Sequence, residues 1–262
     1  MPNDLSKELS LAKKAVLNAG DLIMQIYNSD DFDVYTKNDN SPVTKADRLA
    51  NDLTCRCLSD HFDYPIISEE NNQLRVLPAG KVWVLDPLDG TKSFIEKRGE
   101  FSIMLALLQD FKPVLGLVYD VPNQTLYFAE SGLGSFSQKN TTITKCEMSF
   151  NEEQTMVVSR HHLTKKDQSF AKQLGVNYFL SKSSIGLKAA SLIENKASIY
   201  INFNGLNLWD IAAPYLLVKE AGGVICDKQS KDLFERNEIP LRFENGVFIV
   251  HQKFREILTK NL

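Results

Sequence analysis

Apolar residues recur every three or four positions at the start of the chain and again after Thr44. The first series predicts one long amphipathic helix and comprises Leu5, Leu9, Ala12, Val16, Ala19, Ile23 and Ile26. The second series predicts a helix from about Thr44 to His61, with Ala46, Ala50, Leu53, Cys57 and Leu58 facing inward. Each segment leaves one apolar face that must pack against a core.

Short apolar runs bounded by turn residues follow these helices. The segments "YPIIS" (64–68) and "VWVLD" (82–86) are typical of buried strands. Residues 101–131 hold three further runs separated by "DFKP" and "VPNQ", which predicts an antiparallel meander. A short strand is also expected at Asp33–Thr36. The first part of the chain is therefore expected to combine helices with an antiparallel sheet.

The pattern changes to an alternation of strands and helices beyond about residue 145. Strands are expected in "TMVVSR" (155–160), "NYFLS" (177–181), "ASIYIN" (197–202) and "VFIV" (247–250). Helices are expected at 165–175, 186–196, 208–223 and 252–260. We therefore predict a layered α/β fold of two tightly packed units: an α+β unit at 1–145 and an α/β unit at 146–262.

The composition is that of an ordinary globular protein. Apolar residues make up 43% of the 262 residues and charged residues 24%, with a net charge of −3. This charge gives no reason to expect a nucleic acid polymer or an anionic membrane surface as partner. No apolar stretch reaches the ~18 residues of a membrane span, and the first ten residues are polar. The four cysteines lack zinc-site spacing, so a reduced, cytoplasmic protein is expected.

Carboxylates stand at the ends of several predicted elements. Glu69 and Glu70 follow a strand, Asp86 and Asp89 flank Pro87-Leu88 at the end of another, and Asp210 opens a helix. A solvated loop, a turn and a favourable helix dipole are alternative explanations for these acids taken singly. Two acids beside one buried strand repel each other, however, unless a cation lies between them.

Asp47 also has two interpretations. Thr44-x-x-Asp47 matches a helix capping box, which explains this acid without any chemistry. Together with the other acids, it completes an all-oxygen set of the kind that suits Mg²⁺ or Mn²⁺ rather than zinc. Asp89-Gly90-Thr91 then opens a short helical stretch, whose free backbone N–H groups could bind a phosphate. Acids beside a phosphate site predict metal-assisted phosphoryl transfer or hydrolysis.

Three blocks of the sequence resemble one known family. "SEE", "DPLDGT" and "WDIAAPYLLVKEAGG", in this order, are similar to the motifs of the inositol monophosphatase superfamily, which comprises Mg²⁺-dependent, lithium-sensitive phosphatases. The resemblance implies a sandwich of alternating αβαβα layers. "SPVTKAD", "LDGTKSFIEKRGEFS", "KPVLGLVYDVP" and "VVSRHH" further resemble the 3′(2′),5′-bisphosphate nucleotidase branch. An inositol phosphatase would carry Glu where Phe203 stands. The stretch Ser183–Lys188, Asn202 and Leu206 depart from the nucleotidase pattern, at positions that concern substrate recognition.

The resemblance implies a role for each acid. One Mg²⁺ would be bound by Glu69, Asp86 and the Leu88 carbonyl, and a second by Asp86, Asp89 and Asp210. A third, weaker ion would be shared by Glu69 and Asp47. Mn²⁺ is a plausible substitute, since it accepts the same ligands.

The same resemblance implies the residues that act on the substrate. Asp47 and Thr91 would position and deprotonate the attacking water, and Glu70 would orient it. The phosphate would lie on Leu88, Asp89 and the amides of Gly90 and Thr91, near Asp210. Ser183, Ser184 and Lys188 are candidates for the remainder of the substrate, although a solvated helix lysine explains Lys188 equally well.

The implied reaction converts 3′-phosphoadenosine 5′-phosphate and water to AMP and phosphate, which clears a by-product of sulfur assimilation. One alternative is an inositol-1-monophosphatase or sugar-bisphosphate phosphatase of the same fold. Another is a non-catalytic nucleotide-binding regulator, which should have lost part of the acidic set. A small phosphorylated nucleotide is the expected partner, and the chain would act as a monomer or homodimer. Peripheral attachment to the cytoplasmic face of the inner membrane also occurs in this superfamily.

Overall fold

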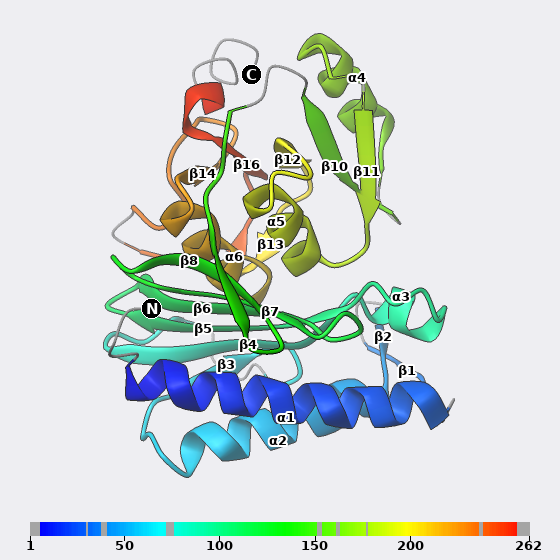
Figure 1. The fold of residues 1–262 in the computed structure, drawn as a ribbon, viewed down its shortest axis with the longest axis vertical. Helices are drawn as coiled ribbons and strands as arrows, with labels where there is room; N and C mark the ends of the chain where they lie inside the picture. The colour runs from blue at the N-terminus through cyan, green and yellow to red at the C-terminus, as the bar shows by residue number, and fades with distance from the viewer. Residues whose placement is uncertain are drawn as a thin grey trace.

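The computed structural model describes residues 6–29, 31–37, 41–71, 76–150, 154–160, 163–176, 178–235 and 238–255. Its elements stack as alternating layers of helices and sheets, as Figure 1 shows. This is the αβαβα arrangement that the sequence predicts. Leu5, the histidine pair after Arg160 and most of the predicted helix at 252–260 lie outside the described residues.

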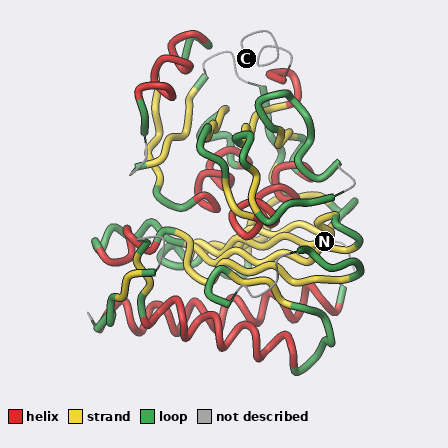
Figure 2. Tube along the Cα trace, turned by 180° about the vertical axis from the view of Figure 1, so that it is seen from behind, coloured by secondary structure: helices red, strands yellow, loops and turns green. Residues whose placement is uncertain are grey.

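The first layer consists of two helices packed side by side, α1 (Lys7–Ser29) and α2 (Lys45–Ser59). Both match the predicted helices, because their apolar stripes face the adjoining sheet. Thr44 caps α2 through the predicted capping box with Asp47. The buried side chains of both helices join one core cluster with strand residues such as Trp83 and Leu105. Figure 2, which shows the molecule from behind, also shows both helices along one face of the sheet.

The second layer is a seven-stranded sheet in which the strands follow their order in the chain. Its first pair is parallel and all later pairs are antiparallel. The predicted meander of three strands continues for two more, which sequence analysis missed because they are polar and partly exposed. The strands are β3 (Ile66–Ser68), β4 (Lys81–Asp89), β5 (Ser102–Gln109), β6 (Lys112–Asp120), β7 (Thr125–Glu130), β8 (Gly134–Lys139) and β9 (Thr142–Cys146).

The third layer consists of α5 (Ile185–Ile193) and α6 (Leu208–Glu220), which cover the other face of this sheet. Gly116 of β6 allows the close approach of α6. A Cβ atom at this position would lie 2.7 Å from the Ala213 carbonyl oxygen, nearer than real contacts permit. Both helices therefore share a core with the strands that precede residue 146. The proposed division into units 1–145 and 146–262 stays a prediction.

The fourth layer is a five-stranded sheet of order β11-β10-β12-β16-β14. Sequence analysis missed β14, a short strand that begins at Gly223, shortly after the end of α6. The helix α4 (Lys165–Gln173) forms the outer layer, where Phe170 packs against this sheet. The strands are β10 (Thr155–Ser159), β11 (Tyr178–Lys182), β12 (Ile199–Asn202), β14 (Gly223–Cys226) and β16 (Val247–His251).

Short elements at the edges of the layers complete the fold. A two-stranded hairpin joins α1 to α2, and α3 follows β4. A second small sheet pairs a segment before α6 with one before β16. No helix in the described part of the chain has the length and apolar character needed to cross a bilayer. These elements are β1 (Tyr35–Thr36), β2 (Pro42–Val43), α3 (Thr91–Ile95), β13 (Leu206–Asn207), β15 (Arg242–Phe243) and the 3₁₀ turn Gln252–Phe254.

Candidate active site

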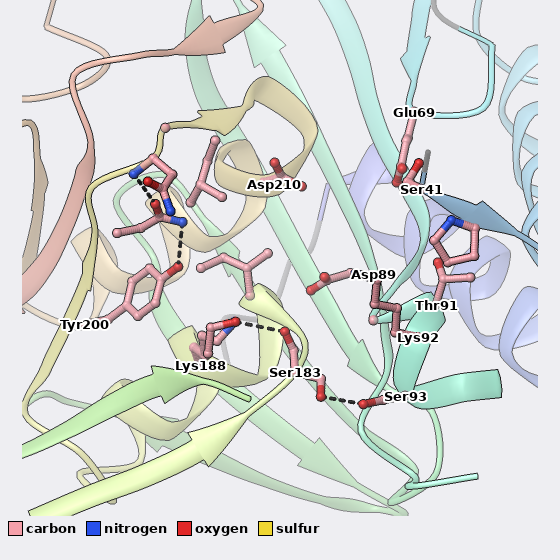
Figure 3. A pocket seen from close by; sticks show the side chains of 18 of the residues that line it. Ser41, Glu69, Asp89, Thr91, Lys92, Ser93, Ser183, Lys188, Tyr200 and Asp210 are labelled. Carbon is pink, nitrogen blue, oxygen red and sulfur yellow. Dashed lines mark hydrogen bonds between the residues drawn. The ribbon is translucent and has the colours of Figure 1, made fainter. Parts of the chain in front are cut away.

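A cleft of about 560 Å³ opens between the end of the seven-stranded sheet and the elements around α5, α6 and β12. Several predicted site residues line it: Glu69, Asp89, Gly90, Thr91, Ser183, Lys188 and Asp210. In Figure 3, Glu69, Asp89 and Asp210 come from three separate elements and border the same open space. Other predicted residues, namely Asp47, Glu70, Asp86, Leu88 and Ser184, are absent from the lining. Of these, Asp47 and Leu88 contact Thr91, and Ser184 contacts Asp89.

The end of β4 is bent where the acids emerge. Asp86 accepts a hydrogen bond from the Leu88 backbone N–H at 3.0 Å through Oδ1, and the pairing with β5 shifts register between Asp86 and Asp89. Gly90 then adopts a φ of 99°, and a Cβ atom there would lie 2.6 Å from the Glu100 carbonyl oxygen. Glycine is required here on both grounds. Asp86 and Asp89, on either side of this bend, lie close enough for the charge of Asp89 to act on Asp86.

Burial and mutual repulsion disfavour ionisation of the acids in the cleft. Burial, followed by the charges of Glu69, Asp89 and Asp210, raises the pKa of Asp86 well above its usual range. Burial and the charges of Glu69 and Asp89 raise the pKa of Asp210 to about 8. The pKa of Asp89 is raised by burial too, although the Lys188 ammonium opposes this. The acids form one interacting group, since each perturbs its neighbours.

These residues fit a divalent cation by their donor chemistry. They offer carboxylate oxygens, and a bound cation would relieve the repulsion that raises the pKa of Asp86 and Asp210. In the described ranges, no group of three or more His, Cys, Asp or Glu side chains is arranged so that it could hold a metal ion. The fit therefore rests on the oxygen donors and their charge, and the assigned ligand sets stay predictions.

Asp47 and Thr91 form a hydrogen-bonded pair across 44 residues of sequence. Thr91 Oγ1 lies 3.0 Å from Asp47 Oδ1 and 3.2 Å from the Leu88 carbonyl oxygen. The other carboxylate oxygen of Asp47 accepts hydrogen bonds from Thr44 and caps α2. Burial raises the pKa of Asp47 to about 7. Asp47 therefore caps a helix with one oxygen and contacts Thr91 with the other, so the two interpretations are compatible.

Lys37 is a site residue that sequence analysis missed. It follows β1, and its ammonium lies 2.8 Å from Glu69 Oε1 and also bonds Glu70 Oε1. These contacts raise the pKa of Lys37 despite opposing desolvation by burial. Burial raises the pKa of Glu70. No local pattern reveals this contact, because 32 residues separate Lys37 from Glu69.

Ser184 connects the two halves of the cleft. Its hydroxyl donates to Asp89 Oδ2 at 2.5 Å, accepts from the Leu187 N–H as the N-cap of α5, and lies 2.8 Å from Ser102 Oγ. Gly186 N–H also donates to Asp89 Oδ2, at 2.9 Å. Ser184 is thus occupied in orienting Asp89, and its predicted contact with substrate would have to replace one of these bonds.

Lys188 and Ser183 lie on the floor of the cleft. The Lys188 ammonium is inside the protein, where the side chain is 3% exposed, and donates to the Ser183 carbonyl oxygen at 2.8 Å. Burial lowers the pKa of Lys188 to about 8, although Asp89 and Asp210 oppose the shift. Lys188 is therefore not a solvated surface lysine. The Ser183 hydroxyl contacts Ser93 Oγ and Glu100 Oε2, so its environment is polar.

The remaining wall of the cleft contains residues that the sequence analysis did not assign to the site, although it named Asn202 as a departure from the nucleotidase pattern. Tyr200, Asn202 and Asn204 come from β12 and the turn after it, and Arg242 comes from β15. Asn202 donates to the Tyr200 hydroxyl and accepts from the Asn204 N–H. Neither β13 nor β15 was predicted, because each has only two residues and no periodic pattern.

Phe203, by contrast, packs away from these polar groups. It makes T-shaped contacts with Phe170 and Phe248 at centroid distances of 5.6 and 5.5 Å. An inositol phosphatase would be expected to carry a glutamate at this position, to bind substrate hydroxyls. Because Phe203 has no carboxylate and packs against other aromatic rings, this position cannot bind inositol hydroxyls in that way. This weighs against the inositol alternative.

Comparison with known proteins identifies the family. Residues 4–259 match the model of the inositol monophosphatase family. The chain is 35% identical over 228 residues to the 3′(2′),5′-bisphosphate nucleotidase CysQ of Escherichia coli strain K12, covering 82% of this chain and 89% of that protein.

Solved structures show the same fold. CysQ from Bacteroides thetaiotaomicron superimposes with a TM-score of 0.78 at 27% identity, over 93% of this chain and 96% of that one. An IMPase from Thermotoga maritima gives a TM-score of 0.83 at 24% identity, over 98% and 96% of the two chains. The predicted fold and the predicted family are both confirmed. With its motifs, its layers and its relatives in agreement, this chain belongs to the inositol monophosphatase family of phosphatases.

Proposed function

We propose that this protein is an Mg²⁺-dependent phosphatase that hydrolyses the 3′-phosphate of 3′-phosphoadenosine 5′-phosphate, giving AMP and phosphate. The observation that carries the proposal is the convergence of Glu69, Asp89, Asp210 and Thr91 on one cleft. The similarity to bisphosphate nucleotidases supports the nucleotide as substrate. Phe203 supports it too, since no carboxylate stands there to bind inositol hydroxyls.

Three sets of protein oxygens are proposed to bind the metal. Glu69, Asp86 and the Leu88 carbonyl would form one set, Asp86, Asp89 and Asp210 a second, with Asp47 and Glu69 as a weaker third. Bound Mg²⁺ makes a water more acidic and offsets negative charge on the phosphoryl group. Lys37 forms ion pairs with Glu69 and Glu70 in this structure, so its ammonium would have to move when Glu69 binds a cation.

The remaining steps use groups of the chain itself. Thr91 takes up a proton from the attacking water and passes its own hydroxyl proton to Asp47 Oδ1, 3.0 Å away. Glu70 also orients this water, alongside Thr91. The backbone N–H groups of Gly90 and Thr91 donate to the phosphate oxygens, which holds the phosphorus in line for attack. The water oxygen adds to the phosphorus, the bond to the ribose 3′-oxygen breaks, and that oxygen takes up a proton from a solvent water.

A turnover panel tests this proposal. Purified protein is incubated with adenosine 3′,5′-bisphosphate, inositol 1-phosphate or a sugar bisphosphate, with and without Mg²⁺, and released phosphate is measured. We expect the highest kcat/KM for the nucleotide and background release without Mg²⁺. A preference for inositol 1-phosphate or the sugar bisphosphate would refute the substrate. Absence of turnover with every compound would instead favour a non-catalytic regulator.

A further inference from the structure

Arg242 is anchored to the element that carries one of the proposed metal ligands. It lies on β15, whose pairing with β13 places Arg242 opposite Asn207. Asn207 is the N-cap of α6, and its backbone N–H donates to Asp210 Oδ2 at 2.7 Å. Arg242 and Asp210 both line the cleft. This small sheet therefore holds a guanidinium beside the acidic centre.

The guanidinium is held in a fixed orientation by three acceptors. Nη1 donates to Asn207 Oδ1 and Nη2 to the Asn204 carbonyl oxygen, each at 3.1 Å, while Nε lies 2.9 Å from Glu244 Oε1. A guanidinium has five N–H donors. Within the described part of the chain, one N–H on each terminal nitrogen has no acceptor. Each of these donors can bind an oxygen of a phosphate.

The other cations that line the cleft are placed differently. Lys188 is buried and donates to a backbone carbonyl beneath the acids. Lys92 stands beside Thr91, on the wall where the scissile phosphate is proposed to bind (Figure 3). Arg242 belongs to the opposite wall, and its side chain is 46% exposed. It is therefore the cation placed to meet a group distant from Thr91.

Charge considerations identify that group. The acids repel any anion that metal does not neutralise, and the chain as a whole is also negative. A substrate with two phosphates thus needs a separate cation for the phosphate that is not cleaved. We infer that Arg242 is a specificity-determining residue whose guanidinium binds the non-scissile phosphate of a bisphosphorylated substrate, an inference that rests on the proposed function. A substrate with one phosphate gains nothing from this contact.

The test compares substrates that differ only in the second phosphate. Wild type and Arg242→Gln are assayed with adenosine 3′,5′-bisphosphate and adenosine 3′-monophosphate. We expect the variant to lose about 10- to 100-fold in kcat/KM for the bisphosphate, mainly through KM. Its kcat/KM for the monophosphate should change by less than about threefold. Arg242→Lys keeps the charge but lacks the planar set of N–H donors of a guanidinium. Its kcat/KM for the bisphosphate should fall between those of wild type and Arg242→Gln.

Controls separate this inference from other effects. Arg56→Gln removes an exposed arginine from α2 and should alter neither substrate. Equal losses on both nucleotides would indicate a general role beside Asp210 and overturn the inference, as would unchanged turnover of the bisphosphate.

The same variants are assayed with inositol 1,4-bisphosphate and inositol 1-phosphate. If wild type hydrolyses these compounds and no nucleotide, the proposed function fails, and the inositol pair alone decides the role of Arg242. In that case, a selective loss on the inositol bisphosphate supports the inference and an equal loss refutes it. A wild-type protein that hydrolyses none of the four compounds overturns both.

Discussion

The two walls of the cleft differ in charge and in construction. The wall formed by β3, β4 and α3 carries carboxylates, and short backbone segments such as 86–91 place them. The facing wall carries amides, a buried phenol and a guanidinium, from β12, β13 and β15. The acidic wall suits cation binding and water activation, whereas the other suits recognition of the intact part of a substrate. Changes to the first should affect kcat, and changes to the second should affect the choice of substrate.

Asp89→Asn should have the largest effect, because it removes charge from the acidic wall and a proposed metal ligand. We expect kcat to fall by about a thousandfold or more at saturating Mg²⁺. The fold should persist, since an asparagine oxygen can still accept from the Gly186 N–H. Phosphate release and circular dichroism measure the two quantities. Asp63→Asn, at an exposed loop position, serves as the matched control. Near-normal turnover of Asp89→Asn would contradict the assignment of the acidic wall.

Thr91→Val tests the proton path on the same wall. It preserves the shape of the side chain and removes the hydroxyl that contacts Asp47. We expect kcat to fall by about a hundredfold, the usual contribution of a positioned proton acceptor. Thr142→Val, an exposed β-strand substitution, should leave turnover unchanged. If Thr91→Val retained full turnover, the Asp47–Thr91 pair would be structural only.

Gly116→Ala tests the packing that brings the two walls together. The added methyl group would meet the α6 backbone, so we expect a loss of about 1–3 kcal/mol in the free energy of unfolding. Turnover should fall as well, because α6 carries Asp210. The methyl group of Gly80→Ala would meet no atom within 4 Å, so this variant introduces only a strained φ. We expect that strain to lower the free energy of unfolding by about 1 kcal/mol. Denaturant unfolding compares the two variants. A smaller loss for Gly116→Ala than for Gly80→Ala would show that the helix does not need this glycine.

Lys37→Met should have the smallest effect. The Lys37 ammonium forms an ion pair with Glu69, so its removal leaves this carboxylate available to a metal ion. We expect Mg²⁺ affinity to rise by up to about fivefold, because a partly exposed ion pair contributes only up to about 1 kcal/mol. Calorimetric titration measures this affinity, with Lys45→Met as control, since Lys45 pairs with Asp31 at the surface. Weaker Mg²⁺ binding in Lys37→Met would mean that the ammonium supports the metal site.

Much of the layered fold and the acidic wall could be predicted from local patterns. The helices α1 and α2 follow from their apolar stripes, and the strands β4 to β7 from apolar runs between turn residues. The polar strands β8 and β9 escaped, because half-exposed hairpin residues carry little periodic signal. The two-residue strands β13 and β15 were not predicted, because they form only through pairing with each other across a long stretch of sequence.

The sequence by itself determined the long helices, most of the apolar strands, the family and the carboxylates that share the segment "DPLDGT". Only the tertiary structure decided that Lys37 bonds Glu69 and Glu70, that Ser184 orients Asp89, and that Arg242 lies beside Asn207. The physical reason is the range of the interactions. Periodicity, turns and caps depend on neighbours within a few residues, and these can be read along the chain. Contacts across 32 to 95 residues arise only when layers pack, and the packing places one polar group against another.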